Sequence, residues 1–164
     1  MDREKLLSMI EQAFAWRQAP QFYISSSQLS PYEIADVLVY QRKDWRSFTC
    51  AQLRENFDFL SFCSPEAYCY CLPGVMSAVV RENRADLLIV GSILSCLDRP
   101  PSRTNWDGFF LECWIKFTLE EYDAIEQWLW WLCEHDSNCD GPRLDDMLTT
   151  VCRCVDTLNI LREK

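Results

Sequence analysis

The side chains in this sequence that are best suited to chemistry are its cysteines, its only histidine and two pairs of carboxylates. The densest cluster is Cys133-Glu134-His135 with Cys139 nearby, which combines zinc-ligand types with a cysteine nucleophile and a histidine base. On a helix, Cys133 and His135 would point about 200° apart, a poor arrangement for sharing a metal ion or for transferring a proton, so a metal site or cysteine catalysis stays only a minor alternative. Two further cysteine pairs share this unsuitable spacing: Cys69/Cys71 and Cys152/Cys154. The sequence therefore predicts no metal ion and no cofactor, and it has no glycine-rich phosphate loop or nucleophile elbow.

The paired carboxylates are Glu120/Glu121 and Asp145/Asp146, and each pair falls in the first turn of a predicted helix. Acidic side chains stabilise that position through the helix dipole, so we interpret both pairs as structural. The sequence thus predicts no catalytic residue, although an enzyme that uses carboxylates stays open as an alternative.

The ten cysteines lie inside apolar helical runs such as AYCYCLP and VCRCV, where free cysteine packs as a small hydrophobe. Disulfide scaffolds are instead short, loop-rich chains with cysteines between turns. We therefore predict largely free, buried thiols and a reducing compartment.

Neither a signal peptide nor a membrane span is predicted. The N-terminus opens Met1-Asp2-Arg3-Glu4-Lys5 and lacks the continuous apolar core of a signal peptide. The apolar run 67–80 has 14 residues and contains Pro73, whereas a bilayer span needs about 20. We expect a cytoplasmic protein.

Helix signals recur along the whole chain. Capping boxes begin at Ser30, Thr49 and Thr118, and Ser64-Pro65-Glu66 begins a further helix. Only four residues are glycine, which argues against a turn-rich sandwich or barrel. The sequence predicts an all-α fold of about six or seven helices in a single domain, residues 1–164.

The helix that starts after Ser64 is apolar almost all round, so we expect it at the centre of the domain, kinked at Pro73. The aromatic segment Phe109–Phe117 could be extended or helical, and periodicity does not decide between the two.

Charge is distributed very unevenly. Residues 106–146 contain eleven acidic and two basic side chains, a net charge of −9, which equals the net charge of the whole chain. The same segment contains five of the seven tryptophans. Such a surface repels nucleic acids and anionic membranes and attracts basic proteins.

Helical geometry indicates which tryptophans of the predicted helix 118–135 are buried and which are exposed. With Tyr122 set at 0°, the apolar stripe spans about 280° to 20°. Trp128 and Trp130 flank this stripe at about 240° and 80°, so we interpret them as core edges. Trp131 lies near 180° on the polar face, and we predict that it is exposed; the alternative is that another helix or the preceding aromatic segment covers it. The predicted partner-binding surface is centred on Trp131, with five carboxylates: Glu120, Glu121, Asp123, Glu134 and Asp136.

The motif Leu60-Ser61, Ser64-Pro65-Glu66-Ala67-Tyr68, Leu72-Pro73, followed later by FTLEEYDAIEQWLWWL, resembles a family of small, uncharacterised bacterial helical proteins. The match covers about two thirds of the chain. It implies a bacterial cytoplasmic origin and a helical fold, and some proteins of this kind accompany secreted toxins as immunity proteins.

From the charge map and this resemblance we expect a non-catalytic inhibitor that neutralises a cognate basic toxin domain. The alternatives are a scaffold subunit that uses the same face in an oligomer, and an enzyme. The acidic segment could also serve solubility alone.

Overall fold

Capping side chains set the starts of several helices, as the sequence predicts. Ser30 accepts a hydrogen bond from the Glu33 amide, and the Glu33 carboxylate accepts one from the Ser30 amide. The boxes Thr49–Gln52 and Thr118–Glu121 form in the same way. Ser64 caps the long central helix by accepting a hydrogen bond from an amide of its first turn.

The computed structural model describes residues 2–25, 28–100, 102, 105–135 and 141–162. These residues form nine α-helices and one 3-10 turn, with no strand beyond a single antiparallel bridge between Ile24 and Cys63. The predicted all-α fold is confirmed. The elements are α1 (Arg3–Phe14), α2 (Pro31–Leu38), η1 (Trp45–Ser47), α3 (Cys50–Glu55), α4 (Phe59–Phe62), α5 (Pro65–Glu82), α6 (Leu88–Leu97), α7 (Gly108–Trp114), α8 (Leu119–His135) and α9 (Gly141–Arg162).

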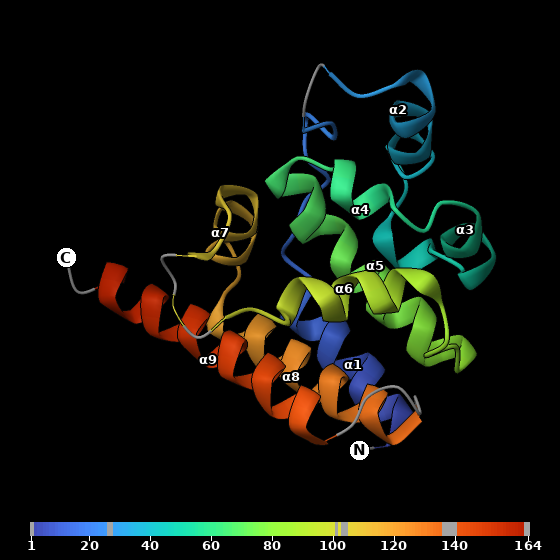
Figure 1. Cartoon of the computed structure of the whole chain (residues 1–164). Helices are drawn as coiled ribbons and strands as arrows, with labels where there is room; N and C mark the ends of the chain where they lie inside the picture. The colour runs from blue at the N-terminus through green and yellow to red at the C-terminus, as the bar shows by residue number, and fades with distance from the viewer. Residues whose placement is uncertain (1, 26–27, 101, 103–104, 136–140, 163–164) are drawn as a thin grey trace.

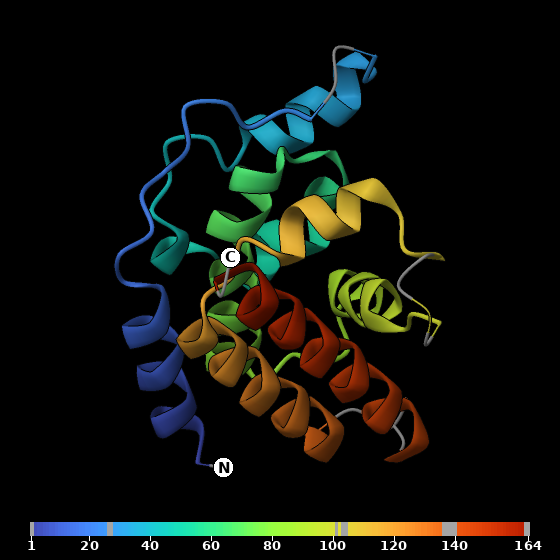
Figure 2. The ribbon, with the colours of Figure 1, turned by 90° about the vertical axis from the view of Figure 1, so that its left-hand side faces the viewer.

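Helix α8 lies between α1 and α9, and these three helices form one side of the molecule (Figures 1 and 2). The central helix α5 packs against α1, η1, α3, α4 and α7, while α6 packs against α9. A single hydrophobic core draws residues from Leu6 to Leu158. None of the described helices is both long and apolar enough to span a membrane.

Helix α5 is buried at every position from Ala67 to Val80, as expected of a central helix. It continues without interruption through Pro73, so the proline does not end it, and the kink itself stays a prediction. Gly74 lets α5 approach η1 closely: a Cβ atom there would lie 2.7 Å from the Trp45 carbonyl oxygen and closer still to the Phe48 ring.

The number of helices in the described residues exceeds the predicted six or seven for two reasons. The short helix predicted from Thr49 to about Phe59 ends at Glu55, and a separate turn, α4, follows. The aromatic segment 109–117 is mostly helical, because Asp107 caps α7 by accepting a hydrogen bond from the Phe110 amide at 2.8 Å.

Candidate protein-binding face

The exposed side of α8 is set by its two neighbours. Because α1 and α9 both pack against α8, its buried residues occupy about half of the helix circumference, from about 180° to 360° on the scale used above. The outward side presents five residues near 80–160°, which we call the acidic face of α8: Glu120, Asp123, Gln127, Trp130 and Glu134.

Trp130 is the aromatic residue of this face. Its side chain is 44% exposed, whereas the described tryptophans other than Trp16 are buried. Trp130 lies between Asp123 and Glu126 on the helix circumference, at about 80° against about 100° and 40°. The face therefore combines a large amphipathic side chain with carboxylates on both sides, a composition typical of protein-binding hot spots.

A groove runs along one edge of the acidic face, between α8 and α1. It has a volume of about 300 Å³ and is lined by Glu120 and Asp123 of α8 and by Met9, Gln12 and Ala13 of α1. Its two acidic residues face an uncharged wall, so a cationic side chain entering the groove would meet carboxylates without a competing base in that wall.

The prediction that Trp131 is exposed is wrong. Its side chain is 1% exposed, and the His135 ring stacks on it with 4.2 Å between ring centroids and 17° between ring planes. The Trp131 carbonyl oxygen also contacts His135 Nδ1 at 2.8 Å. The covering alternative was the right one, since α8 is packed on two sides. The positions could have indicated this, because Trp131 lies beside Ala124 whereas Trp130 lies between two acidic residues.

Glu121 belongs to the fold rather than to an exposed surface, and its predicted place in the binding surface is also wrong. Its side chain is fully buried, and its carboxylate forms a bidentate ion pair with Arg17, Nε to Oε1 at 2.5 Å and Nη2 to Oε2 at 2.7 Å. The same carboxylate accepts a hydrogen bond from the Thr118 amide at 2.8 Å. Burial raises the pKa of Glu121, and the bonds from Arg17 act against this shift. The predicted capping box already indicated this role, because the fourth residue of such a box turns back to the cap.

The other predicted members of the surface divide into two groups. Glu120, Asp123 and Glu134 are exposed and lie together on the acidic face of α8. Asp136 lies outside the described residues. The sequence therefore predicts the helix and three of its outward carboxylates correctly, but the exposed tryptophan of this helix is Trp130 and not Trp131.

The described members of the cysteine and histidine cluster at the end of α8 already have partners. Cys133 is disulfide-bonded and therefore offers no thiolate, a departure from the expected free thiols. His135 is held by the Trp131 ring and carbonyl group. Cys139 lies outside the described residues. Among the described residues, no three histidine, cysteine or acidic side chains are close enough together to hold a metal ion.

Eight cysteines of the described chain are free, and most are buried. Burial raises the pKa of Cys50 to about 11 and that of Cys69 to about 12. Burial also raises the pKa of Cys71 and Cys113. These thiols stay protonated at neutral pH and behave as small apolar side chains, as predicted.

Comparisons with protein-family models, with curated proteins and with solved structures found no match to this chain. The resemblance to small bacterial helical proteins therefore stays a prediction, and the site itself is the basis for assigning a function.

Proposed function

We propose that this chain is a non-catalytic, cytoplasmic protein-binding module that binds a basic protein partner through the acidic face of α8. The observation that carries the proposal is the exposure of Trp130 among the outward carboxylates Glu120, Asp123 and Glu134. A half-exposed tryptophan supplies a large apolar contact, and the carboxylates steer a cationic surface toward it.

The distribution of charge favours a positively charged partner. Residues 106–146 carry a net charge of −9, and α8 contains five of their eleven acidic side chains, while Asp145 and Asp146 lie in α9 beyond its first turn. Two of these acids are paired with arginines from outside the segment, Glu121 with Arg17 and Asp107 with Arg99. The remaining excess of like charge still weakens the compact state by repulsion, so a partner that neutralises it gives a reason for its presence. Nucleic acids and anionic membranes are disfavoured as partners for the same reason.

The specific form that we propose is an inhibitor of the immunity-protein kind, bound to a basic toxin domain. The support is twofold: the predicted family resemblance includes toxin-immunity proteins, and an inhibitor needs a complementary surface but no reactive group. A scaffold subunit would use the same face, but its partner would lack an activity that this chain suppresses.

The experiment compares partners recovered from the native host by three forms of the chain: the wild type, Glu120→Lys/Asp123→Lys and the control Glu55→Lys/Asp98→Lys. Both double variants change the net charge from −9 to about −5, and all four substituted residues are exposed. We expect a basic protein to be recovered with the wild type and the control but not with the acidic-face variant.

Two outcomes separate the proposals. If the recovered partner binds the acidic-face variant as well as it binds the control, then α8 is not the binding face. If the partner has no activity that the added chain inhibits, the scaffold alternative replaces the inhibitor.

A further inference from the structure

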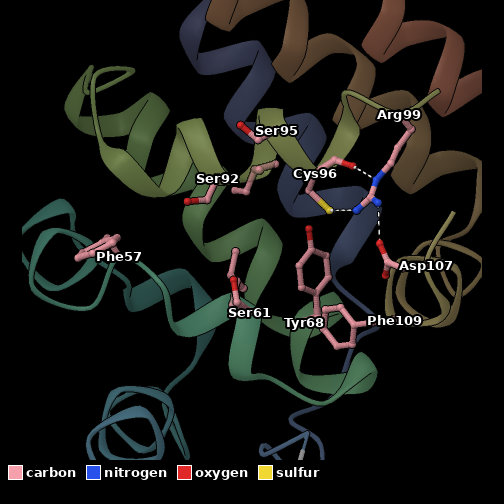
Figure 3. A pocket seen from close by; sticks show the side chains of 11 residues that line it. Phe57, Ser61, Tyr68, Ser92, Ser95, Cys96, Arg99, Asp107 and Phe109 are labelled. Carbon is pink, nitrogen blue, oxygen red and sulfur yellow. Dashed lines mark hydrogen bonds and ion pairs between the residues drawn. The ribbon is translucent and has the colours of Figure 1, made fainter. Parts of the chain in front are cut away.

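A pocket on another side of the molecule lies among α4, α5, α6 and α7 (Figure 3). Its volume is about 320 Å³, at the lower end of the range for small-molecule sites. None of its described lining residues belongs to α1, α8 or α9, so the pocket is separate from the acidic face of α8. An apolar cavity of about 150 Å³ holds one benzene ring. The pocket is therefore large enough for a bicyclic ring system.

The pocket walls are mainly apolar and aromatic. Phe57 lies at one end and Phe109 lies near the other, with its ring perpendicular to that of Tyr68 at 6.2 Å between centroids. Leu60 also lines the pocket. Ile93 of α6 contributes an aliphatic wall. Flat hydrophobic ligands suit such a lining, because aromatic rings pack edge-to-face as well as stacked.

The hydroxyl group of Tyr68 is the unusual polar group of this pocket. Tyr68 is 4% exposed, and its hydroxyl oxygen is buried without a hydrogen bond to any residue that the structure describes. The hydroxyl points along the pocket toward Cys96 of α6 (Figure 3). Burial raises the pKa of Tyr68 well above its usual value, so the group keeps its proton and can donate it in a hydrogen bond. A buried hydroxyl group that lacks a partner is disfavoured, and a ligand atom that accepts this proton would remove the penalty.

The charged residues of the pocket compensate each other. The Arg99 guanidinium donates to an Asp107 carboxylate oxygen at 2.5 Å through Nη1 and to the Cys96 carbonyl oxygen at 2.7 Å through Nε. It also lies over the Phe110 ring, 4.5 Å from the centroid. Because Asp107 already neutralises Arg99, an anionic ligand would have to compete with this carboxylate.

We propose that the pocket binds a neutral, flat, bicyclic-sized aromatic molecule whose hydrogen-bond acceptor pairs with the Tyr68 hydroxyl group. The aromatic walls hold the ring, the Tyr68 hydroxyl fixes its orientation, and the Arg99–Asp107 pair disfavours a charged replacement. Ser61, Ser92 and Ser95 line the pocket as well and supply it with further hydroxyl groups.

The test titrates the full chain with quinoline, a neutral bicyclic ring with one acceptor nitrogen, and follows the δ1 methyl signal of Ile93 by ¹H–¹³C nuclear magnetic resonance. An Ile93→Val variant assigns the signal. We expect a saturable shift with a dissociation constant of about 1 mM, as is usual for a ligand of this size. 1-Methylindole, a similar ring without an acceptor, and 2-naphthoate, an anion, are titrated in parallel.

Two variants distinguish the hydrogen bond from the cavity. Tyr68→Phe should weaken quinoline binding about five- to tenfold and leave 1-methylindole binding unchanged, because it removes only the hydroxyl group. Ser61→Phe should fill the pocket and abolish binding of both probes, and the control Ser8→Phe, on the exposed side of α1, should not. Thermal unfolding checks that every variant is folded.

The proposal is overturned if quinoline produces no saturable shift at Ile93, or if Tyr68→Phe binds it as tightly as the wild type does. Tighter binding of 2-naphthoate than of quinoline would overturn the preference for a neutral ligand.

Discussion

Replacing Arg17 with methionine should destabilise the protein strongly, because the substitution leaves the buried carboxylate of Glu121 without its cation. In the wild type, the guanidinium makes both bonds of the bidentate pair and donates a third hydrogen bond to the Lys116 carbonyl oxygen at 2.9 Å. The arginine side chain is 10% exposed and the glutamate 0% exposed, so water cannot take over these bonds. Among the residues that the structure describes, the Thr118 amide is then the one remaining hydrogen-bond donor to this carboxylate.

The expected loss in the free energy of unfolding is about 3–5 kcal/mol, the range for breaking a buried ion pair from one side. For a chain of this length each kcal/mol lowers the midpoint of thermal unfolding by about 2–4 °C, so the midpoint should fall by roughly 6–20 °C. The double variant Arg17→Met/Glu121→Met should recover much of this loss, since no buried charge is then left unpaired. Urea unfolding followed by tryptophan fluorescence measures both variants.

The loss should depend on pH. Burial already raises the pKa of Glu121 above its ordinary value of 4.5. The contribution of the Glu121 carboxyl group to stability is therefore largest below pH 4.5, and it falls as the pH rises through the folded-state pKa. Removing Arg17 takes away the interaction that opposes this shift, and the pKa should rise further. The destabilisation by Arg17→Met should therefore be larger at about pH 7 than at about pH 5, where the carboxyl group of the variant is more often protonated.

The control is Arg84→Met, which breaks an exposed ion pair with Asp86 and should change stability little, because water screens that pair. An effect of Arg17→Met as small as that of Arg84→Met, or one that is equal at both pH values, would refute the structural role given to Glu121. So would a double variant that is no more stable than Arg17→Met alone.

Two further predictions concern the packing of α5 and the reactivity of the thiols. Gly74→Ala should destabilise the fold by about 1–3 kcal/mol through overpacking. Gly91→Ala in α6, where a Cβ atom meets nothing within 4 Å, should be neutral or stabilising by up to about 1 kcal/mol. Thermal unfolding measures both variants, and equal effects would contradict the close approach of α5 to η1. Iodoacetamide should alkylate the exposed Cys152 in the native protein and reach Cys69 only on unfolding, because burial raises the pKa of Cys69 to about 12. Mass spectrometry identifies the modified residues, and early modification of Cys69 would contradict its burial.

Local signals in the sequence predicted much of the fold because they act over one or two helical turns. The caps at Ser30, Thr49, Ser64 and Thr118 all form, since each needs only a side chain and the amides of the turn that follows. The central position of α5 could also be predicted locally, because its residues are apolar on every side.

The misassigned residues depend on contacts between distant segments. Glu121 is paired with Arg17, which is 104 positions away in the sequence, and no local pattern reveals that contact. Trp131 is buried because α8 has two helical neighbours, whereas a single apolar stripe was assumed for it. The pocket beside Tyr68 is also assembled from several helices, so sequence spacing alone could not place it.

The most direct test of the proposed binding face is the rate at which the basic partner dissociates from Trp130→Ala, measured by surface plasmon resonance once that partner has been identified. The matched control is Trp16→Ala, which removes another exposed tryptophan, 58% exposed just beyond α1. Truncating an interface anchor typically costs about 2–4 kcal/mol of binding, so Trp130→Ala should weaken the complex roughly 30- to 1,000-fold, mostly through faster dissociation. Trp16→Ala should dissociate like the wild type. If Trp130→Ala also dissociates like the wild type, then the acidic face of α8 does not bind the partner.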